Sequence, residues 1–176
     1  MKPSGTLRGM RQAVFFVLVV LGAGCRGLLA GTTFSKDAVA YRVVPPNDGK
    51  GWRRVDFADN DLAWLANESG HVVAINATCS DHEDPQLDVL TKHLVMGFTD
   101  REWLTQTPFT LDGRDALRSK VRAKLDGVPM SLELVVMKKN GCVHDFEYIS
   151  PVGHEAEHQA EFDALVNGFK QERRGE

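Results

Sequence analysis

Residues 117–126 alternate strictly along the chain, and this pattern constrains the fold more than any other. The odd positions carry Leu, Ser, Val, Ala and Leu, and the even positions carry Arg, Lys, Arg, Lys and Asp. A period of two predicts a β-strand with one face against a core and a basic row in water. Asp126-Gly127 and Asn140-Gly141 are two-residue hairpin signals, so we expect residues 128–136 and 142–149 to continue an antiparallel meander.

Four shorter strand candidates precede this meander, at residues 40–44, 52–57, 62–67 and 71–78. They contain β-branched or aromatic side chains, and turn-forming proline, glycine and asparagine residues separate them. Residues 26–38 show no sustained period and are interpreted as a tether.

Two segments have a helical period instead. The first helix is expected to carry apolar residues three or four positions apart, namely Leu87, Leu90, Leu94 and Phe98. Asp81 or Asp84 is the expected cap of this helix. The second helix is expected to bury Phe162, Leu165, Val166 and Phe169. Its C-terminal end is expected to carry the cations Lys170, Arg173 and Arg174.

Strands, a helix, strand hairpins and a second helix in this order predict an α+β domain, an antiparallel sheet meander with helices packed on it. The order resembles the PsbP-like fold, an α/β/α sandwich shared by an extrinsic photosystem II protein and a Ran-binding nuclear import factor. The resemblance covers residues 39–170 and rests on Phe162-x-x-Leu165-Val166-x-x-Phe169, Gly113-Arg114-x-Ala116 and the Asp126-Gly127 hairpin. It implies a fold and a binding role, and it implies no reaction.

The first 24 residues have the layout of a signal peptide. Three basic residues precede an apolar run over residues 13–24, which is too short to span a bilayer. Leu21-Gly22-Ala23-Gly24-Cys25 resembles the lipobox of bacterial lipoproteins, although Gly22 stands where a large aliphatic residue is usual. We therefore expect a lipoprotein signal peptide at 1–24, lipidation of Cys25, a lipid-anchored tether at 25–38 and a single domain at 39–176. The alternative is ordinary signal-peptidase cleavage near Cys25 or Ala30.

Export would place the other two cysteines in a compartment where disulfides form. If lipid occupies Cys25, then Cys79 and Cys142 remain as an even pair in an oxidising compartment, which favours a disulfide. In the chain-entropy model such a loop closure stabilises the fold by about 4 kcal/mol. Two unrelated buried thiols are the alternative interpretation.

Charge limits the partners of the mature protein. Removal of residues 1–24 takes away three basic residues and no acidic residue, which leaves 18 Lys and Arg against 24 Asp and Glu, a net charge of −6. An acidic domain is a poor nucleic-acid binder, so the expected partners are the membrane, through the lipid, and an envelope protein. The basic row is a possible face for anionic lipid or an acidic partner, or else a solvated strand face: Arg118, Lys120, Arg122 and Lys124.

Two clusters contain residue types that bind metal ions. His154-Glu155-Ala156-Glu157-His158 satisfies H-E-x-x-H, the pattern in which a helix presents two imidazoles to zinc and a glutamate activates water. Glu157 and the preceding Gly153 argue for a solvated helix start instead. The acidic stretch from Asp81 to Asp84, with His93 beyond it, has carboxylates for a divalent cation but lacks the EF-hand spacing.

The sequence thus favours a membrane-anchored bacterial envelope lipoprotein with a non-catalytic interaction or accessory domain and no cofactor. The rival interpretation is a small zinc-dependent hydrolase that uses His154, Glu155 and His158. A third is a binder of small apolar ligands between sheet and helix.

Overall fold

The structure is a computed structural model, which describes residues 31–36, 39–46, 51–57, 60–67, 69–79 and 84–172. The signal peptide, Cys25, Asp81, Arg173 and Arg174 lie outside these residues. What the sequence predicts for them stays a prediction.

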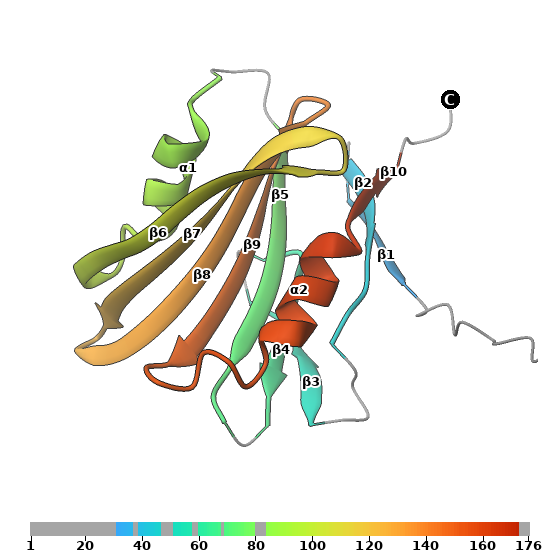
Figure 1. The fold of residues 1–176 in the computed structure, drawn as a ribbon. Coiled ribbons are helices and arrows are strands. Elements are labelled where there is room, and N and C mark those ends of the chain that lie inside the picture. The colour runs from blue at the N-terminus through green and yellow to red at the C-terminus, as the bar shows by residue number, and fades with distance from the viewer. Residues whose placement is uncertain are drawn as a thin grey trace, which may run out of the picture.

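The centre of the fold is a seven-stranded antiparallel sheet in the order β3-β4-β5-β9-β8-β7-β6 (Figure 1). Two meanders therefore meet where β5 pairs with β9. The strand bounds are β3 Trp52–Val55, β4 Leu62–Ala66, β5 Val72–Cys79, β6 Thr99–Leu111, β7 Arg114–Leu125, β8 Val128–Lys139 and β9 Cys142–Pro151.

Tight turns with two residues at positive φ join the long strands. Asp126-Gly127 and Asn140-Gly141 have φ of 51° and 81° and of 51° and 77°, as a type I′ turn requires, so both predicted hairpins are confirmed. Asp112-Gly113 forms a third turn of this kind, with φ of 47° and 75°. It pairs β7 with β6, a strand that the sequence analysis missed, and β6 begins at Thr99, where only the end of a helix was expected.

A small sheet in the order β1-β2-β10 lies beside the large one and consists of β1 Thr32–Lys36, β2 Val39–Val43 and β10 Lys170–Glu172. Residues 32–36 were expected to be tether, and the structure corrects this because they pair with the buried strand β2. Lys170 was expected at a helix end, and it lies in β10 instead.

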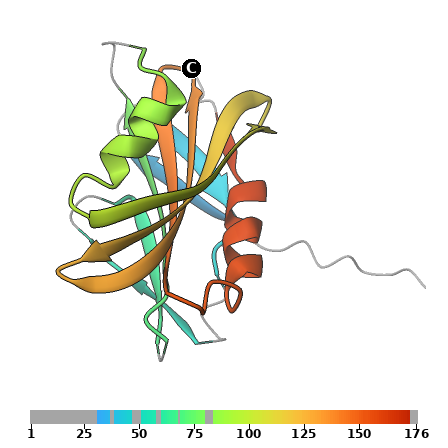
Figure 2. The ribbon, with the colours of Figure 1, turned by 60° about the vertical axis from the view of Figure 1, so that its left-hand side comes forward.

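Two helices lie on opposite faces of the large sheet, as Figure 2 shows: α1 Leu87–Leu94 and α2 Gln159–Asn167. The first begins after Gln86 and has no side-chain cap, so the cap predicted at Asp84 is wrong. Instead, the Asp84 carboxylate forms an ion pair with the Lys138 ammonium group of β8. None of the described helices has the length and apolar character needed to cross a membrane.

The main core lies between the large sheet, α2 and the small sheet. The four apolar residues predicted on the second helix are all fully buried, and each such burial contributes about 2 kcal/mol: Phe162, Leu165, Val166 and Phe169. A second, smaller core under α1 contains Val121, Leu132 and Leu134. Helix, sheet and helix form the predicted α/β/α sandwich.

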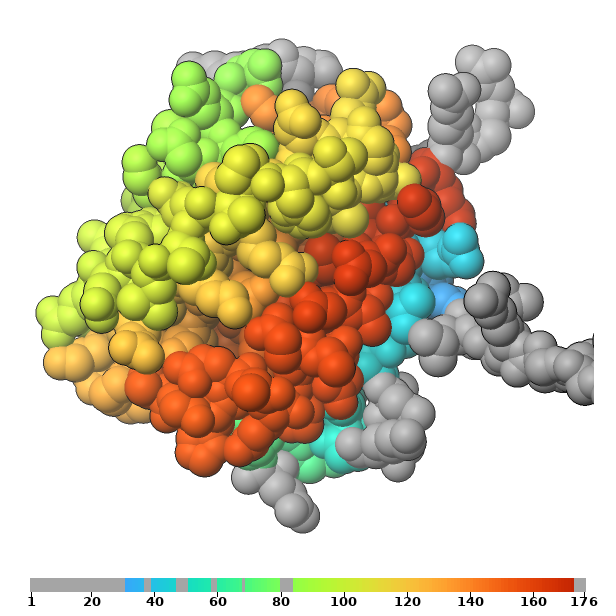
Figure 3. Space-filling view, in the orientation of Figure 1, coloured from blue at the N-terminus to red at the C-terminus, as the bar shows by residue number. Residues whose placement is uncertain are grey.

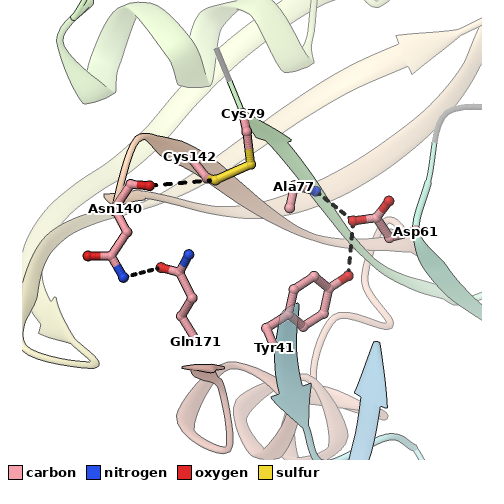
Figure 4. The surroundings of a disulfide bond; sticks show 7 residues. All are labelled: Tyr41, Asp61, Ala77, Cys79, Asn140, Cys142 and Gln171. Atoms are coloured by element: carbon pink, nitrogen blue, oxygen red, sulfur yellow. Dashed lines mark hydrogen bonds between the residues drawn. A yellow bond between two sulfur atoms is a disulfide. The ribbon is translucent and has the colours of Figure 1, made fainter. Parts of the chain in front are cut away.

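The disulfide between Cys79 and Cys142 is present, as the sequence predicted. The two cysteines are opposite each other on β5 and β9. Figure 4 shows the polar contacts around them: Tyr41 of β2 and the backbone N–H of Ala77 both donate to the Asp61 carboxylate, at 3.1 and 2.9 Å. The disulfide joins two neighbouring strands of the large sheet, and the hydrogen bond from Tyr41 to Asp61 links the small sheet to the large one.

Candidate functional site

The H-E-x-x-H segment does not form a zincin helix. Residues 155–158 are turns, His154 lies before them and α2 begins only at Gln159, so His154 and His158 do not share a helical face. The His154 Nδ1 atom lies 2.6 Å from a Glu157 carboxylate oxygen. Glu155 accepts a hydrogen bond from the Ser131 hydroxyl at 2.5 Å, which lowers the pKa of Glu155 to about 2 together with backbone hydrogen bonds. The geometry that the hydrolase interpretation needs is therefore not built.

His158 meets a different histidine. His71, just before β5, is completely buried, and the centroids of its ring and the His158 ring are 4.7 Å apart in an edge-on arrangement. The Nδ1 atom of His71 lies 2.8 Å from the Ser69 hydroxyl, and its Nε2 atom lies 3.1 Å from the His154 carbonyl oxygen. The second carboxylate oxygen of Glu157 lies 3.9 Å from the same Nε2 atom.

Two nitrogen atoms in this cluster are buried without a hydrogen-bond partner among the described residues. They are Nδ1 of His158 and Nε1 of Trp52, whose ring packs against His158 with centroids 4.9 Å apart. The nearest acid to Nδ1 of His158 is Glu161, whose carboxylate oxygen is 3.6 Å away. A buried unpaired polar atom costs about 1–3 kcal/mol, so this cluster holds unused bonding capacity. We call His71, Glu157 and His158 the histidine cluster.

The opposite end of α2 has a polar cluster of another kind, centred on Asp112. Its carboxylate accepts hydrogen bonds from Lys139 at 2.6 Å, from Lys170 at 3.1 Å and from the backbone N–H of Gln171 at 3.0 Å. Burial works against ionisation of Asp112, but these hydrogen bonds outweigh it and lower the pKa of that carboxyl. We call this group the Asp112 cluster.

The basic row lies on β7 as predicted, but acidic groups of the same chain accompany it. Arg118 pairs with Glu133 at 3.1 Å and with Asp163 at 2.7 Å, and Lys120 shares Glu133 at 3.1 Å. The other pair of the row, Lys124 with Asp100, is 2.8 Å long. Much of the row's charge is thus balanced within the domain. Its use as a face for an anionic partner stays a prediction.

A groove of about 960 Å³ lies beside the disulfide, between α1 and the sheet. Charged groups, among them Asp84, Lys138 and Asp145, take part in its lining. Burial, and then the charge of Glu147, raise the pKa of Asp145 to about 7. A groove lined in this way gives little support to the interpretation as a binder of small apolar ligands.

Strand β6 is the most exposed element of the large sheet. Its first ten residues, 99–108, are exposed, and they include Trp103 and Leu104, which are 36% and 42% exposed. Figure 3 shows the strand as a yellow-green band across the surface. Its register with β7 shifts twice, between Thr99 and Glu102 and between Trp103 and Thr105. Bulges of this kind twist an edge strand and re-aim its side chains.

Solved structures show the fold at low sequence identity. Cyanobacterial PsbP (CyanoP) from Synechocystis sp. PCC 6803 has a TM-score of 0.53 at 17% identity, with 86% of this chain and 98% of that chain covered. LpqN, involved in cell envelope biogenesis of Mycobacterium tuberculosis, has a TM-score of 0.57 at 9% identity, with 81% and 90% covered. The Saccharomyces cerevisiae Ran-binding protein Mog1p has a TM-score of 0.50 at 11% identity, with 81% and 95% covered.

No protein-family model and no curated protein matches the sequence. The domain nevertheless has the PsbP-like fold that the sequence pattern predicted, an α+β sandwich. These likenesses concern the fold alone, because every identity is below 25%.

Sequence reasoning found His158 and Glu157 only as parts of the wrong motif, and it missed His71 and Asp112. His71 is a lone histidine 83 positions before His154. No local pattern links it to the C-terminal turn. Asp112 had a signal that was available, because Asp112-Gly113 is the same type of dipeptide as Asp126-Gly127.

Proposed function

We propose that the protein is a bacterial envelope lipoprotein, anchored through Cys25, whose domain is a non-catalytic accessory module that binds a protein partner along strand β6. The signal-peptide layout and the Cys25 context support the anchor. The disulfide supports an oxidising compartment outside the cytoplasm. LpqN, which shares the fold, supports an envelope role by analogy.

The observation that carries the binding role is the exposed edge of β6. The strand has 13 residues, about 43 Å at the usual rise per residue, and it lies at the end of the sheet order. An edge strand presents backbone N–H and C=O groups to which an extended segment of another protein can add. The described residues form no strand on its outer side.

Side chains near this edge suit recognition as well. Trp103 and Leu104 are exposed large apolar residues, and aromatic residues are enriched at protein interfaces. Arg101 and Glu102 precede them, and Pro108 follows, so charge and proline protect the edge against unselective pairing. We therefore expect a partner strand whose apolar side chains contact Trp103 and Leu104, with polar groups around them.

The anchor is tested by metabolic labelling with a fatty-acid analogue, followed by membrane fractionation. We expect label in the wild-type protein and none in Cys25→Ala, which would be released from the membrane. Equal labelling of both proteins contradicts the anchor.

The binding edge is tested by site-specific photo-crosslinking in the native envelope. A photoreactive residue at Leu104 is expected to give one discrete adduct with a protein. The same residue at Val152, which is also 42% exposed but lies in the turn after β9, is expected to give none. Identical adduct patterns at both positions, or no adduct at Leu104, contradict the proposal.

A further inference from the structure

We propose that the histidine cluster binds one divalent transition-metal ion, and that zinc is the metal its donor set fits. One ligand atom from each of His71, Glu157 and His158 lies within 4.8 Å of the other two. His71 lies just before β5, and Glu157 and His158 lie in the turn before α2, so only the folded domain brings the three residues together. This inference is independent of the lipid anchor and of the partner edge.

The donor set is two imidazoles and a carboxylate. Zinc binds imidazole nitrogen at about 2.0–2.1 Å and carboxylate oxygen at about 2.0–2.2 Å, usually with four ligands. A tetrahedron of that size has ligand atoms roughly 3.4 Å apart. The cluster must therefore contract by up to about 1.4 Å on binding. The Glu157 side chain can supply this movement because it is 48% exposed.

Burial distinguishes this cluster from a chance grouping of surface acids. The His71 ring is fully buried, and Nδ1 of His158 is buried without a hydrogen-bond partner among the described residues. A fold that leaves an imidazole nitrogen in this state bears a cost of about 1–3 kcal/mol. Coordination of a metal through Nδ1 would give that nitrogen a partner, while Nε2 of the same ring lies 3.4 Å from the Ser69 hydroxyl.

Both ring nitrogens of His71 lie beside an oxygen, the Ser69 hydroxyl at Nδ1 and the His154 carbonyl at Nε2. A metal-ligating histidine donates its other ring N–H to an oxygen, which fixes the tautomer and the ring orientation. The Ser69 hydroxyl, 2.8 Å from Nδ1 of His71, is placed to accept this hydrogen bond. Without metal, the Nε2 N–H of His71 donates to the His154 carbonyl oxygen at 3.1 Å, because a carbonyl oxygen only accepts. Coordination through Nε2, the atom that faces Glu157, therefore moves the proton to Nδ1 and replaces that hydrogen bond.

His154 then has a role that the H-E-x-x-H pattern does not predict. Its Nδ1 atom bonds one carboxylate oxygen of Glu157 at 2.6 Å, while the other oxygen of Glu157 faces His71. His154 therefore positions the ligand Glu157 and does not itself contact the ion. Outer-shell partners of this kind are worth about 10–100-fold in metal affinity.

The proposal is tested by equilibrium dialysis of zinc against the disulfide-intact protein from which any affinity tag has been removed. We expect one zinc per chain in the wild type. His71→Gln and His158→Gln should each weaken binding by more than about 100-fold, and His154→Gln by about tenfold. His93→Gln is the matched control, an exposed histidine on α1, and should leave binding unchanged.

His71→Gln distinguishes this site from a zincin pair, because a pair of His154 and His158 would bind zinc without His71. Absence of bound zinc in the wild type overturns the proposal, and so does wild-type affinity in His71→Gln. If His71→Gln does not fold, Glu157→Gln replaces it, since its side chain is half exposed. Unchanged zinc affinity in a folded Glu157→Gln protein also overturns the proposal.

Discussion

The two ends of helix α2 both have polar clusters that join it to the sheet, but the clusters are opposite in character. At the C-terminal end, Asp112 uses both carboxylate oxygens, and two lysines and a backbone N–H saturate it. At the N-terminal end, the histidine cluster has a buried ring nitrogen with no hydrogen-bond partner among the described residues. A saturated cluster contributes stability, whereas an unsaturated one retains donor atoms for a ligand.

The largest expected effect is on the saturated side. Asp112→Ala should lower the free energy of unfolding by about 3 kcal/mol, because it leaves the mostly buried Lys139 ammonium without its carboxylate. Urea denaturation measures this loss. Asp112→Asn is the matched control, since asparagine tolerates the positive φ of residue 112 and removes only the charge. A loss below about 1 kcal/mol in Asp112→Ala would contradict a structural role.

Asp145 is a second buried carboxyl, and its environment raises its pKa, whereas the environment of Asp112 lowers the pKa of that carboxyl. Burial raises the pKa of Asp145 to about 7, against about 3.9 in an unfolded chain. The folded protein thus holds this proton more tightly, and the associated stability is present below pH 4 and is lost as the pH rises towards 7.

Asp145→Asn should remove this pH dependence. At pH 8 we expect the variant to be more stable than the wild type by about 2 kcal/mol, and below pH 4 the difference should vanish. Denaturation curves over this pH range provide the measurement. For Asp112, whose pKa is lowered, the sign is reversed, and its contribution is lost as the pH falls. Parallel pH profiles for wild type and Asp145→Asn would refute the account of Asp145.

The smallest effect is expected on the unsaturated side. His158→Phe keeps an aromatic ring against Trp52 and removes the buried nitrogen that has no partner. At pH 8 and without metal, its free energy of unfolding should equal that of the wild type or exceed it by about 1 kcal/mol. Thermal unfolding in the presence of a chelator is the measurement. A loss above 2 kcal/mol would place His158 among the structural residues.

The parts of the fold that face a core could be predicted from the sequence. The alternation along β7 and the dipeptides at the hairpin turns locate β7, β8 and β9, and the apolar spacing locates α2. These signals exist because burial imposes a period on the chain. Strand β6 gave no such signal, because eleven of its 13 residues are exposed and no core selects their polarity.

The polar clusters were less predictable for a different reason. A spacing rule predicted the pair His154 and His158, but the chain forms turns there, and the third partner, His71, comes from a distant strand. Likewise, the sequence predicted Lys170 at the end of a helix, whereas it lies in β10 of the small sheet and pairs with Asp112 in the turn between β6 and β7. Contacts of this kind depend on topology, and local sequence does not encode topology directly.

The central claim is that the N-terminal end of α2 has a ligand site, whereas the Asp112 cluster at its C-terminal end stabilises the fold. Thermal unfolding with and without zinc tests this claim most directly. At a free zinc concentration of about 100 times the dissociation constant, one site adds about 2.7 kcal/mol to the free energy of unfolding. We predict this gain for the wild type and for His93→Gln, and less than about 0.5 kcal/mol for His71→Gln. An equal gain in His71→Gln, or no gain in the wild type, would contradict the account.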